Sequence, residues 1–331
     1  MEHVDIADTG LKASRIGLGT WAIGGSSWGG TDEDAAIRTI RTAVNRGISL
    51  IDTAPAYGFG RAEEILGKAL ADSGLRDRVL LATKVGLVWR DGRILRDASR
   101  QRIERDIADS LRRLRTDVID LYQVHWPDPH TPCDETAEAM RRLYEQGKIR
   151  AIGVSNFTPA DMETFRQAAP LHVAQPPYNL YERAIERDLL PYCQAHGITT
   201  LTYGALCRGL FSGRMSPETK FHEDDLRRVD PKFNAIWFPR YLKATERLDY
   251  LAQERFRKRV IHLALRWLLD QPGVGVALWG ARRPEQLEPL SELWDFHVDA
   301  DAKGAIDAIL RDEVAGGPGP EFMAPPEEPV G

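Results

Sequence analysis

Short apolar runs and amphipathic stretches alternate along almost the whole chain, and this alternation restricts the fold more than any other feature of the sequence. The runs are of strand length, and residues with apolar positions at helical spacing follow them. The predicted strands cover residues 15–20, 48–52, 79–84, 118–125, 151–156, 173–178, 199–204 and 274–280. Eight strands alternating with eight helices predict an α/β fold, the parallel (β/α)8 or TIM barrel.

Two further elements flank the predicted barrel. Residues 2–14 are typical of a β-hairpin that caps the barrel at its N-terminus, and an extra C-terminal helix is predicted at about 299–312. We therefore expect a single barrel domain over residues 1–314 and a Gly/Pro-rich tail, 315–331, that is extended or mobile. The alternative fold, a doubly wound open sheet, lacks its usual GxGxxG turn between a strand and a helix.

Local signals place several helix limits. Thr31 is a candidate N-cap, and Pro159 suits the first turn of the helix that follows residues 151–156. A helix is also predicted to begin at Pro284, after the last strand. Residues from 205 to about 240 follow no regular pattern and form a long insertion.

Composition excludes several classes of function. The chain has 331 residues, 43% hydrophobic and 28% charged, with a net charge of −5 and no basic stripe, so nucleic acid is not expected as a partner. No apolar run reaches the roughly 18 residues of a membrane span, and the first ten residues do not resemble a signal peptide. The three cysteines, Cys133, Cys193 and Cys207, lack CxxC spacing and are expected as free thiols. We expect a cytoplasmic protein, a monomer or small homo-oligomer.

Polar side chains end three consecutive predicted strands. Asp52 ends the second strand, Lys84 the third and His125 the fourth, while Tyr57 lies in the loop beyond Asp52. The active sites of such barrels lie at the carboxyl ends of the strands, so these four side chains should meet at the mouth. Each also has an ordinary interpretation: Asp52 as a turn cap, Tyr57 as an edge-packing ring, Lys84 as a rim charge and His125 as a core imidazole. Their occurrence on neighbouring strands favours a site.

These four residues suit proton transfer to an oxygen that gains charge. A phenol has a pKa of about 10, and we expect the Lys84 ammonium to lower the pKa of Tyr57. Asp52 would keep Lys84 charged, and a neutral His125 would donate a hydrogen bond to a substrate oxygen. The set serves carbonyl reduction or alcohol oxidation, and because no side chain donates hydride, a nicotinamide cofactor is required.

The sequence resembles the aldo-keto reductase superfamily over nearly its whole length. The motifs that carry the resemblance are IGLGTWAIGG, IDTAPAYGFGRAEEILGKAL, ATKVG, IDLYQVHWPD, KIRAIGVSN and the Gly-Leu-Phe-Ser-Gly of 209–213, in matching order. The resemblance implies Asp52, Tyr57, Lys84 and His125 as a catalytic tetrad, with Tyr57 as the general acid in reduction. Within the superfamily, the chain looks most like bacterial members that act on short sugars, polyols and aldehydes.

The same resemblance implies the cofactor site. It places Ser155, Asn156 and Gln175 at the nicotinamide carboxamide and Tyr203 against the nicotinamide ring. The full set of expected cofactor residues is Thr20, Trp21, Asp52, Ser155, Asn156, Gln175, Tyr203, Gly204, Leu206, Arg208, Gly209, Gly280, Arg282 and Gln286.

The last two predicted loops have the composition of a phosphate site. TIM barrels commonly bind phosphate after strands seven and eight. Gly280 lets the backbone approach an anion, and Arg282 and Arg283 supply positive charge before a helix N-terminus, although a solvated arginine pair is the alternative. Arg208 and Arg282 favour NADP(H), with NAD(H) as the alternative. Two positions depart from the family pattern: Trp279 replaces a proline, and Leu290 replaces an asparagine expected at the adenine.

Aromatic residues in the mouth loops predict the substrate pocket. Aromatic walls suit both sugars and hydrophobic carbonyls, although single tryptophans can equally serve loop packing. The expected pocket residues are Trp21, Trp28, Tyr57, Trp89, His125 and Trp126, around a small carbonyl or alcohol. The insertion at 214–240, which carries Trp237, is a candidate lid over the cofactor.

Two alternatives of other classes remain. A regulatory subunit that binds cofactor without turnover, as some relatives of this superfamily do, would share these motifs, although the intact tetrad disfavours it. A metal-dependent barrel hydrolase or isomerase could use Asp52 and His125. It would need two histidines at ligand spacing, and Lys84 would repel its cation, so no metal is expected.

Overall fold

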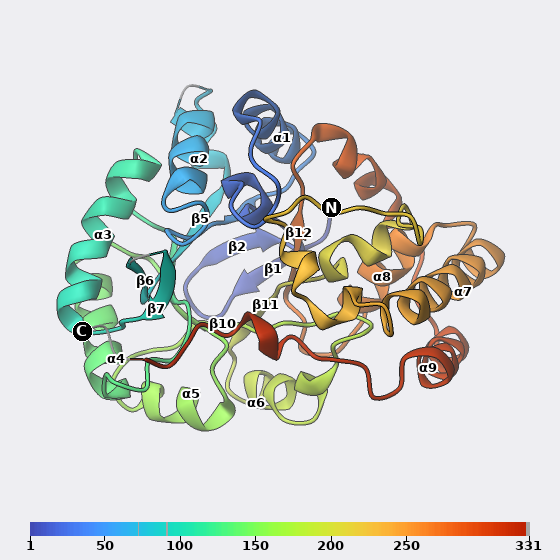
Figure 1. The fold of residues 1–331 in the computed structure, drawn as a ribbon. Helices are drawn as coiled ribbons and strands as arrows, with labels where there is room; N and C mark the ends of the chain where they lie inside the picture. The colour runs from blue at the N-terminus through green and yellow to red at the C-terminus, as the bar shows by residue number, and fades with distance from the viewer. Residues whose placement is uncertain (72, 91, 329–331) are drawn as a thin grey trace.

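A closed barrel of eight parallel strands forms the centre of the protein, in a computed structural model that describes residues 1–71, 73–90 and 92–328 (Figure 1). The (β/α)8 prediction is therefore confirmed. Around the barrel the strands follow the order β10-β11-β12-β3-β4-β5-β8-β9. Their bounds are β3 Ile16–Gly19, β4 Leu50–Asp52, β5 Leu80–Val85, β8 Leu121–Val124, β9 Ile152–Ser155, β10 Val173–Gln175, β11 Thr199–Thr202 and β12 Val276–Gly280.

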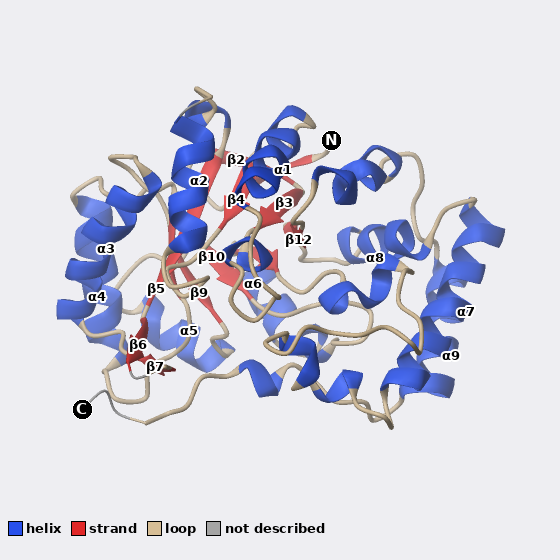
Figure 2. Ribbon diagram, turned by 45° about the horizontal axis from the view of Figure 1, so that its top comes forward, coloured by secondary structure: helices blue, strands red, loops and turns tan. Residues whose placement is uncertain are grey.

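Amphipathic helices lie around the barrel, and the long helices near the C-terminus pack on one another rather than on the strands (Figure 2). The helices are α1 Glu33–Asn45, α2 Arg61–Ala71, α3 Arg100–Leu114, α4 Cys133–Glu145, α5 Pro159–Arg166, α6 Leu189–Ala195, α7 Phe238–Phe256, α8 Val260–Leu269 and α9 Ala300–Val314. The helix expected from Pro284 is instead a 3-10 segment, Pro284–Glu292, and it contains Pro289, which cannot donate an α-helical hydrogen bond.

The structure corrects one predicted helix start and confirms another. The carboxylate of Asp32, rather than the hydroxyl of Thr31, accepts the backbone N–H of Ala35 and caps α1. Thr31 donates instead to the carbonyl of Ile23. At α5, Pro159 occupies the first turn as expected.

The N-terminal hairpin closes one end of the barrel. β1 (His3–Ile6) pairs antiparallel with β2 (Leu11–Ser14). Ile6 and Ala13 of the hairpin are buried in one cluster with Leu50, Leu121 and other side chains from the barrel strands. The lower barrel is therefore filled by packed side chains, and only the opposite end is open for chemistry.

A second hairpin follows β5 and was not predicted. β6 (Leu87–Arg90) pairs antiparallel with β7 (Arg93–Arg96) outside the barrel sheet. The Asp-Gly pair at 91–92 of the sequence is a typical hairpin turn signal and could have revealed it.

The C-terminal tail, red in Figure 1, leaves α9 and crosses the mouth side of the barrel to the β6–β7 hairpin. There Arg96 donates to the carbonyl of Pro325 at 2.8 Å, and His130 Nε2 lies 2.7 Å from the carbonyl of Glu327. The tail contains one 3-10 turn, Glu321–Met323, and makes contacts up to Glu328, which pairs with Arg93 of the hairpin. The last three residues of the predicted tail, 329–331, lie outside the described part of the chain.

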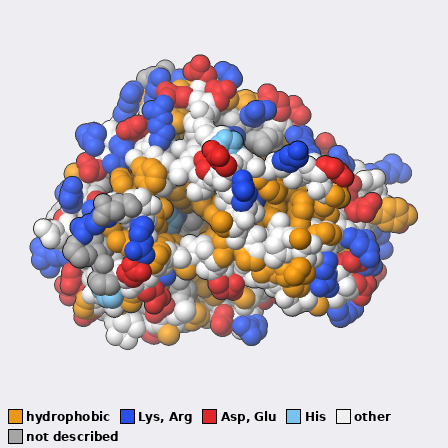
Figure 3. Space-filling view, viewed as in Figure 1, with side chains coloured by type: hydrophobic (Ala, Val, Ile, Leu, Met, Phe, Trp, Pro, Cys, Tyr) orange, Lys and Arg blue, Asp and Glu red, His pale blue; other side chains and the backbone are white. Residues whose placement is uncertain are grey.

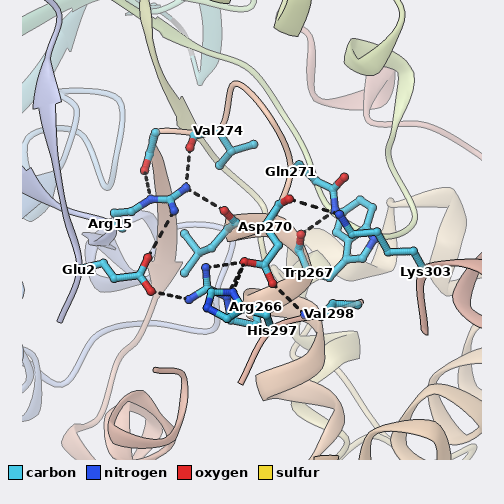
Figure 4. A network of polar contacts seen from close by, with 12 residues as sticks. Glu2, Arg15, Arg266, Trp267, Asp270, Gln271, Val274, His297, Val298 and Lys303 are labelled. Carbon is cyan, nitrogen blue, oxygen red and sulfur yellow. Dashed lines mark hydrogen bonds and ion pairs between the residues drawn. The ribbon is translucent and has the colours of Figure 1, made fainter. Parts of the chain in front are cut away.

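An ion-pair network joins the N-terminus to the closed end of the barrel (Figure 4). The buried Arg266 of α8 lies 2.8 Å from Glu2 and 2.7 Å from Asp270. Arg15, which precedes β3, donates to the carbonyls of Leu269 and Val274.

Cys133, Cys193 and Cys207 are free thiols, as predicted. No helix in the described ranges is long and apolar enough to cross a membrane.

Candidate active site

The four predicted side chains meet at the open end of the barrel. Lys84 Nζ lies 2.6 Å from Asp52 Oδ2 and donates to the Tyr57 hydroxyl at 3.1 Å. The rings of Tyr57 and His125 meet edge to face, with centroids 5.7 Å apart. Asp52 and Lys84 come from the paired strands β4 and β5, and His125 directly follows β8, which pairs with β5. The mouth face is hollowed, and hydrophobic side chains gather around the hollow (Figure 3).

Close backbone contact fixes the loop that carries Tyr57. Gly58 has φ +65°, and a Cβ on it would lie 2.1 Å from the carbonyl oxygen of Gly24. Only glycine fits such an approach at that φ. The two loops after β3 and β4 therefore pack directly against each other, which holds Tyr57 above Lys84.

A pair of glutamines, one of them missed by the sequence reasoning, orients the Asp52 carboxylate. Gln123 Nε2 and Gln175 Nε2 donate to Asp52 Oδ1 at 3.1 and 2.9 Å, and Gln175 also donates to Gln123 Oε1. Asp52 Oδ2 thus stays on Lys84. Gln123 precedes His125 by two residues, and this period of two could have placed both on one face of the strand.

The pKa of Tyr57 differs in direction from the sequence expectation. Burial, and then the Asp52 carboxylate, raise the pKa of Tyr57 well above its usual value, whereas a lowered pKa was expected. The Asp52 carboxylate lies beside the ammonium that was expected to stabilise the phenolate, and its negative charge opposes ionisation of the phenol. Tyr57 therefore holds its proton at neutral pH.

Burial also lowers the pKa values of the two basic groups. The pKa of Lys84 falls below its usual value because the side chain is fully buried, although Asp52 opposes the change. For His125, burial and then the charge of Lys84 hold the pKa well below its usual value. A lowered pKa favours the neutral imidazole, the form that the sequence analysis expected.

The residues expected at the nicotinamide carboxamide form one hydrogen-bonded group beside the tetrad. Ser155 Oγ donates to the carbonyl of Gln175 at 2.8 Å, and Asn156 Nδ2 donates to the carbonyl of His125 at 3.0 Å. Tyr203 OH donates to Asn156 Oδ1 at 2.8 Å. Asn156 has φ 63°, an uncommon conformation that these contacts hold in place.

The loop after β3 also reaches the tetrad. Thr20 Oγ1 donates to the Asp52 carbonyl at 3.0 Å. Trp21 stacks on Tyr57 with centroids 6.1 Å apart and meets Trp28 edge to face at 5.6 Å. The indole Nε1 of Trp28 is buried without a hydrogen-bond partner among the described residues.

Trp89 and Trp126, both predicted to line the substrate pocket, contact residues outside the tetrad. Trp89, on the unpredicted β6–β7 hairpin, packs edge-on against Phe59 and lines a surface pocket with Pro55 and Arg102. The Arg96 guanidinium lies 5.4 Å from the ring centroid of Trp126 and joins that ring to the C-terminal tail.

The loop after β12 has the open backbone expected of an anion site. A Cβ on Gly280 would meet only the carbonyl oxygen of Gly19, at 4.0 Å. Gln286 Oε1 accepts the backbone N–H groups of Arg282 and Arg283, and the Arg282 guanidinium donates to the carbonyls of Trp28 and Gly30. The two positions that depart from the family pattern, Trp279 and Leu290, are buried.

The loop after β11 holds the remaining expected cofactor residues, Gly204, Leu206, Arg208 and Gly209. The carbonyl of Gly204 accepts Asn179 Nδ2 at 3.0 Å. Arg208 is buried, and its guanidinium pairs with Glu182 at 2.9 Å and with Asp230 at 3.0 Å. The Arg208 guanidinium therefore points into the protein interior, toward these two carboxylates.

The residues of the described ranges include no group of three or more His, Cys, Asp or Glu that could hold a metal ion.

Residues 15–311 match the aldo/keto reductase family. The chain belongs to this family. It is 58% identical to aldo-keto reductase YhdN of Bacillus subtilis (strain 168). The alignment spans 326 residues and covers 98% of each chain. It is 35% identical to the NADH-specific methylglyoxal reductase of Escherichia coli (strain K12), over 91% of this chain and 96% of that one.

Solved aldo/keto reductase structures have the same fold. The glycerol dehydrogenase AKR11B4 from Gluconobacter oxydans superposes with a TM-score of 0.87 at 48% identity, covering 97% of this chain and 99% of that one. An aldo/keto reductase from Klebsiella pneumoniae, in complex with NADP and acetate, superposes with a TM-score of 0.71 at 30% identity, covering 92% and 95%.

Proposed function

We propose that this protein is an NADP(H)-dependent oxidoreductase that reduces aldehydes and ketones, such as small sugars and polyol-derived carbonyls, to alcohols, in a reversible reaction. The observation that carries the proposal is the contact of one buried ammonium, Lys84, with both Asp52 and the Tyr57 hydroxyl at the barrel mouth. Family membership supports the reaction class.

The residues around the tetrad fit a nicotinamide dinucleotide. Gln175 uses its amide N–H groups on Asp52 and Gln123, which leaves its Oε1 to accept from a carboxamide. We assign the carboxamide to Ser155, Asn156 and Gln175, and the ring to Tyr203. The uncrowded Gly280 lets a phosphate approach the backbone. The bound nicotinamide would supply the hydride.

In the proposed mechanism Tyr57 is the general acid. The raised pKa of Tyr57 keeps its proton in place until the carbonyl oxygen gains charge. As the proton moves to that oxygen, Lys84 at 3.1 Å stabilises the phenolate that forms. A neutral His125 donates a hydrogen bond to the same oxygen and orients the carbonyl. The reduced carbon thus gains a hydride and the oxygen a proton.

Arg282 supports NADP(H) as the preferred cofactor. Its guanidinium donates to two neutral carbonyls, which leave its positive charge available to a 2′-phosphate. The NADP complex of the Klebsiella pneumoniae protein is consistent with this preference. The Escherichia coli relative is NADH-specific, so NAD(H) is the competing cofactor.

The mouth fits a small hydroxylated carbonyl. Trp21 and Trp28 present aromatic surface beside Tyr57. Two relatives are a glycerol dehydrogenase and a methylglyoxal reductase, and both names indicate small oxygen-rich substrates.

We further propose that residues 214–240 form a lid over the cofactor. The backbone N–H of Leu226 donates to the carbonyl of Ser27 at 2.9 Å, and Arg227 stacks on Trp28 at 5.4 Å. This segment starts after β11 and reaches the loop after β3, while β12 lies between those two strands. It therefore passes over the strand end where Gly280 and Arg282 lie, the expected phosphate site.

A substrate survey tests the proposal. NADPH and NADH consumption is measured against a panel of aldehydes, ketoses and aldoses, with oxidation of the matching alcohols run in parallel. We expect turnover with small aldehydes or hydroxyketones and a lower KM for NADPH than for NADH. Tight nucleotide binding without turnover on any member would favour the regulatory-subunit alternative.

A further inference from the structure

Beside the cofactor loop lies a buried cluster of four charged side chains that the proposed chemistry does not use. We name Glu182, Arg208, Asp230 and Lys232 the four-charge cluster; each is at most 8% exposed, and their formal charges sum to zero. They come from three segments: the loop after β10, the loop after β11 and the candidate lid. Burying four charges is costly, so the cluster requires an explanation.

The two carboxylates of the cluster occupy both cations. Arg208 Nη1 lies 2.9 Å from Glu182 Oε1, and Lys232 Nζ lies 2.8 Å from the same oxygen. Arg208 Nε lies 3.0 Å from Asp230 Oδ2, as an ion pair rather than an aligned hydrogen bond. A nucleotide 2′-phosphate would have to replace these carboxylates and leave them buried without a cation.

The free sides of both cations face the C-terminal tail. Lys232 Nζ donates to the carbonyl of Gly319 at 3.0 Å. The Arg208 guanidinium lies 5.2 Å from the ring centroid of Phe322, and its Nη2 is 3.4 Å from the sulfur of Met323. The cluster thus joins the lid, the tail and the loop after β11 at one point.

The backbone at this point is strained. Cys207 and Arg208 have φ values of 44° and 51°, in the left-handed region that residues other than glycine rarely adopt. Such a conformation persists only where its surroundings enforce it, and it is typical of functional loops. The buried ion pairs of Arg208 supply that constraint.

We propose that Arg208 is a positioning residue and not a ligand of the 2′-phosphate. Through the four-charge cluster it fixes the loop after β11, the lid segment 225–233 and the tail segment 319–323 as one unit, so that the nucleotide site is formed before cofactor arrives. This proposal rests on the proposed binding of a nicotinamide dinucleotide. Its consequence is that the cluster strengthens binding of NADPH and NADH by the same factor.

Asp230→Asn separates the two roles because they predict opposite signs. If Arg208 bound the 2′-phosphate, removing the charge of Asp230 would free it and tighten NADPH relative to NADH. If Arg208 positions the loops, the variant reduces the fraction of formed sites, and the affinity for both nucleotides falls on the order of tenfold with an unchanged ratio. Dissociation constants are measured by fluorescence titration with NADPH and NADH.

Amide hydrogen exchange of the nucleotide-free protein tests the cluster without any cofactor. We expect Asp230→Asn to accelerate amide exchange in both 225–233 and 319–323, although the tail segment is far from residue 230 in the sequence. Glu218→Gln is the matched control, because it removes an exposed carboxylate from the same lid, outside the four-charge cluster, and should change neither exchange nor affinity. Lys232→Met is the second variant, with the same predicted outcome, should Asp230→Asn fail to fold.

Three results would overturn the proposal: a rise or fall of the NADPH-to-NADH affinity ratio in the cluster variants, unchanged affinity for both nucleotides, or unchanged exchange in the tail. Failure of the proposed function looks different. In that case the unmodified protein binds neither nucleotide, while the exchange experiment still reports whether the cluster joins lid and tail.

Discussion

At the residue scale, the proposed chemistry depends on three groups whose pKa values burial shifts. Tyr57 keeps its proton because burial and Asp52 raise its pKa. His125 stays neutral because burial and Lys84 lower its pKa. Lys84 has a lowered pKa and yet lies on a carboxylate, so it is the one member of the set whose charge is lost most easily at alkaline pH.

Replacing Tyr57 by Phe should remove the proton donor and leave the cofactor site intact. We expect kcat for reduction to fall on the order of a thousandfold, while the dissociation constant for NADPH is unchanged. Tyr192→Phe is the control: it also removes a tyrosine hydroxyl, one on α6 that donates a hydrogen bond to Glu163, and it should retain full turnover. Comparable turnover in Tyr57→Phe would remove Tyr57 from the acid role.

The pH dependence of reduction should reflect Lys84. Between about pH 6 and about pH 8 neither His125 nor Tyr57 changes charge, so kcat/KM should be flat. Because the pKa of Lys84 is lowered from 10.5, its ammonium is present at neutral pH and lost as pH rises, so activity should decline before 10.5. Steady-state profiles measure this, and a step between about pH 6 and about pH 7 would show that His125 titrates instead.

At the element scale, loop packing decides where the tetrad residues stand. The loop after β4 has to approach Gly24 so closely that Gly58 admits no side chain. The loops after β3, β11 and β12 meet through Leu226 and Arg282 above the barrel. The strands provide the positions, and these loop contacts bring the side chains within reach of each other.

Gly58→Ala should displace the Tyr57 loop. The positive φ alone costs about 1–2 kcal/mol for an alanine. Gly74→Ala is the matched control, because Gly74 has φ +63° and nothing within 4 Å of its added Cβ. We expect Gly58→Ala to lose roughly 1–3 kcal/mol more than the control in free energy of unfolding, through overlap with Gly24. It should also lose turnover, and equal effects of the two variants in urea unfolding would contradict this.

The lid proposal predicts protection by cofactor. Within residues 214–240, the part at 214–224 lies outside the segment that the four-charge cluster holds and contains no helix or strand, so it should be cut by protease in the free protein. Saturating NADPH should slow cleavage there and leave cleavage elsewhere unchanged. Mapping the fragments by mass spectrometry tests this, and an identical pattern with and without NADPH counts against a lid.

At the scale of the whole molecule, the packed end of the barrel and the proposed active site lie opposite each other. The hairpin β1–β2 and the network around Arg266 close the lower end, and the tetrad occupies the upper end. This separation is the usual one in TIM barrels. It predicts that the lower end can be changed without loss of activity per folded molecule.

Arg266→Met should destabilise the fold and leave the chemistry unchanged. The variant leaves Glu2 and Asp270 without their buried partner. Because both carboxylates are partly exposed, we expect a loss of roughly 2 kcal/mol in free energy of unfolding. Arg255→Met removes an exposed pair with Asp299 and should cost much less than Arg266→Met. Urea unfolding and kcat of the folded fraction measure both effects, and a lowered kcat would contradict the separation.

The sequence by itself determined the barrel, the strand ends that carry the tetrad and the family, because these follow from local periodicity and from residues a few positions apart. Gln123 and the β6–β7 hairpin around Trp89 had local signals in the sequence, a period of two and an Asp-Gly pair, that the predictions did not use. The sequence did not determine the direction of the Tyr57 pKa shift or the burial of Arg208. The tertiary structure decided these, since a pKa depends on burial and on every nearby charge. Arg208 meets Glu182, Asp230 and the tail only after segments far apart in the chain have packed together.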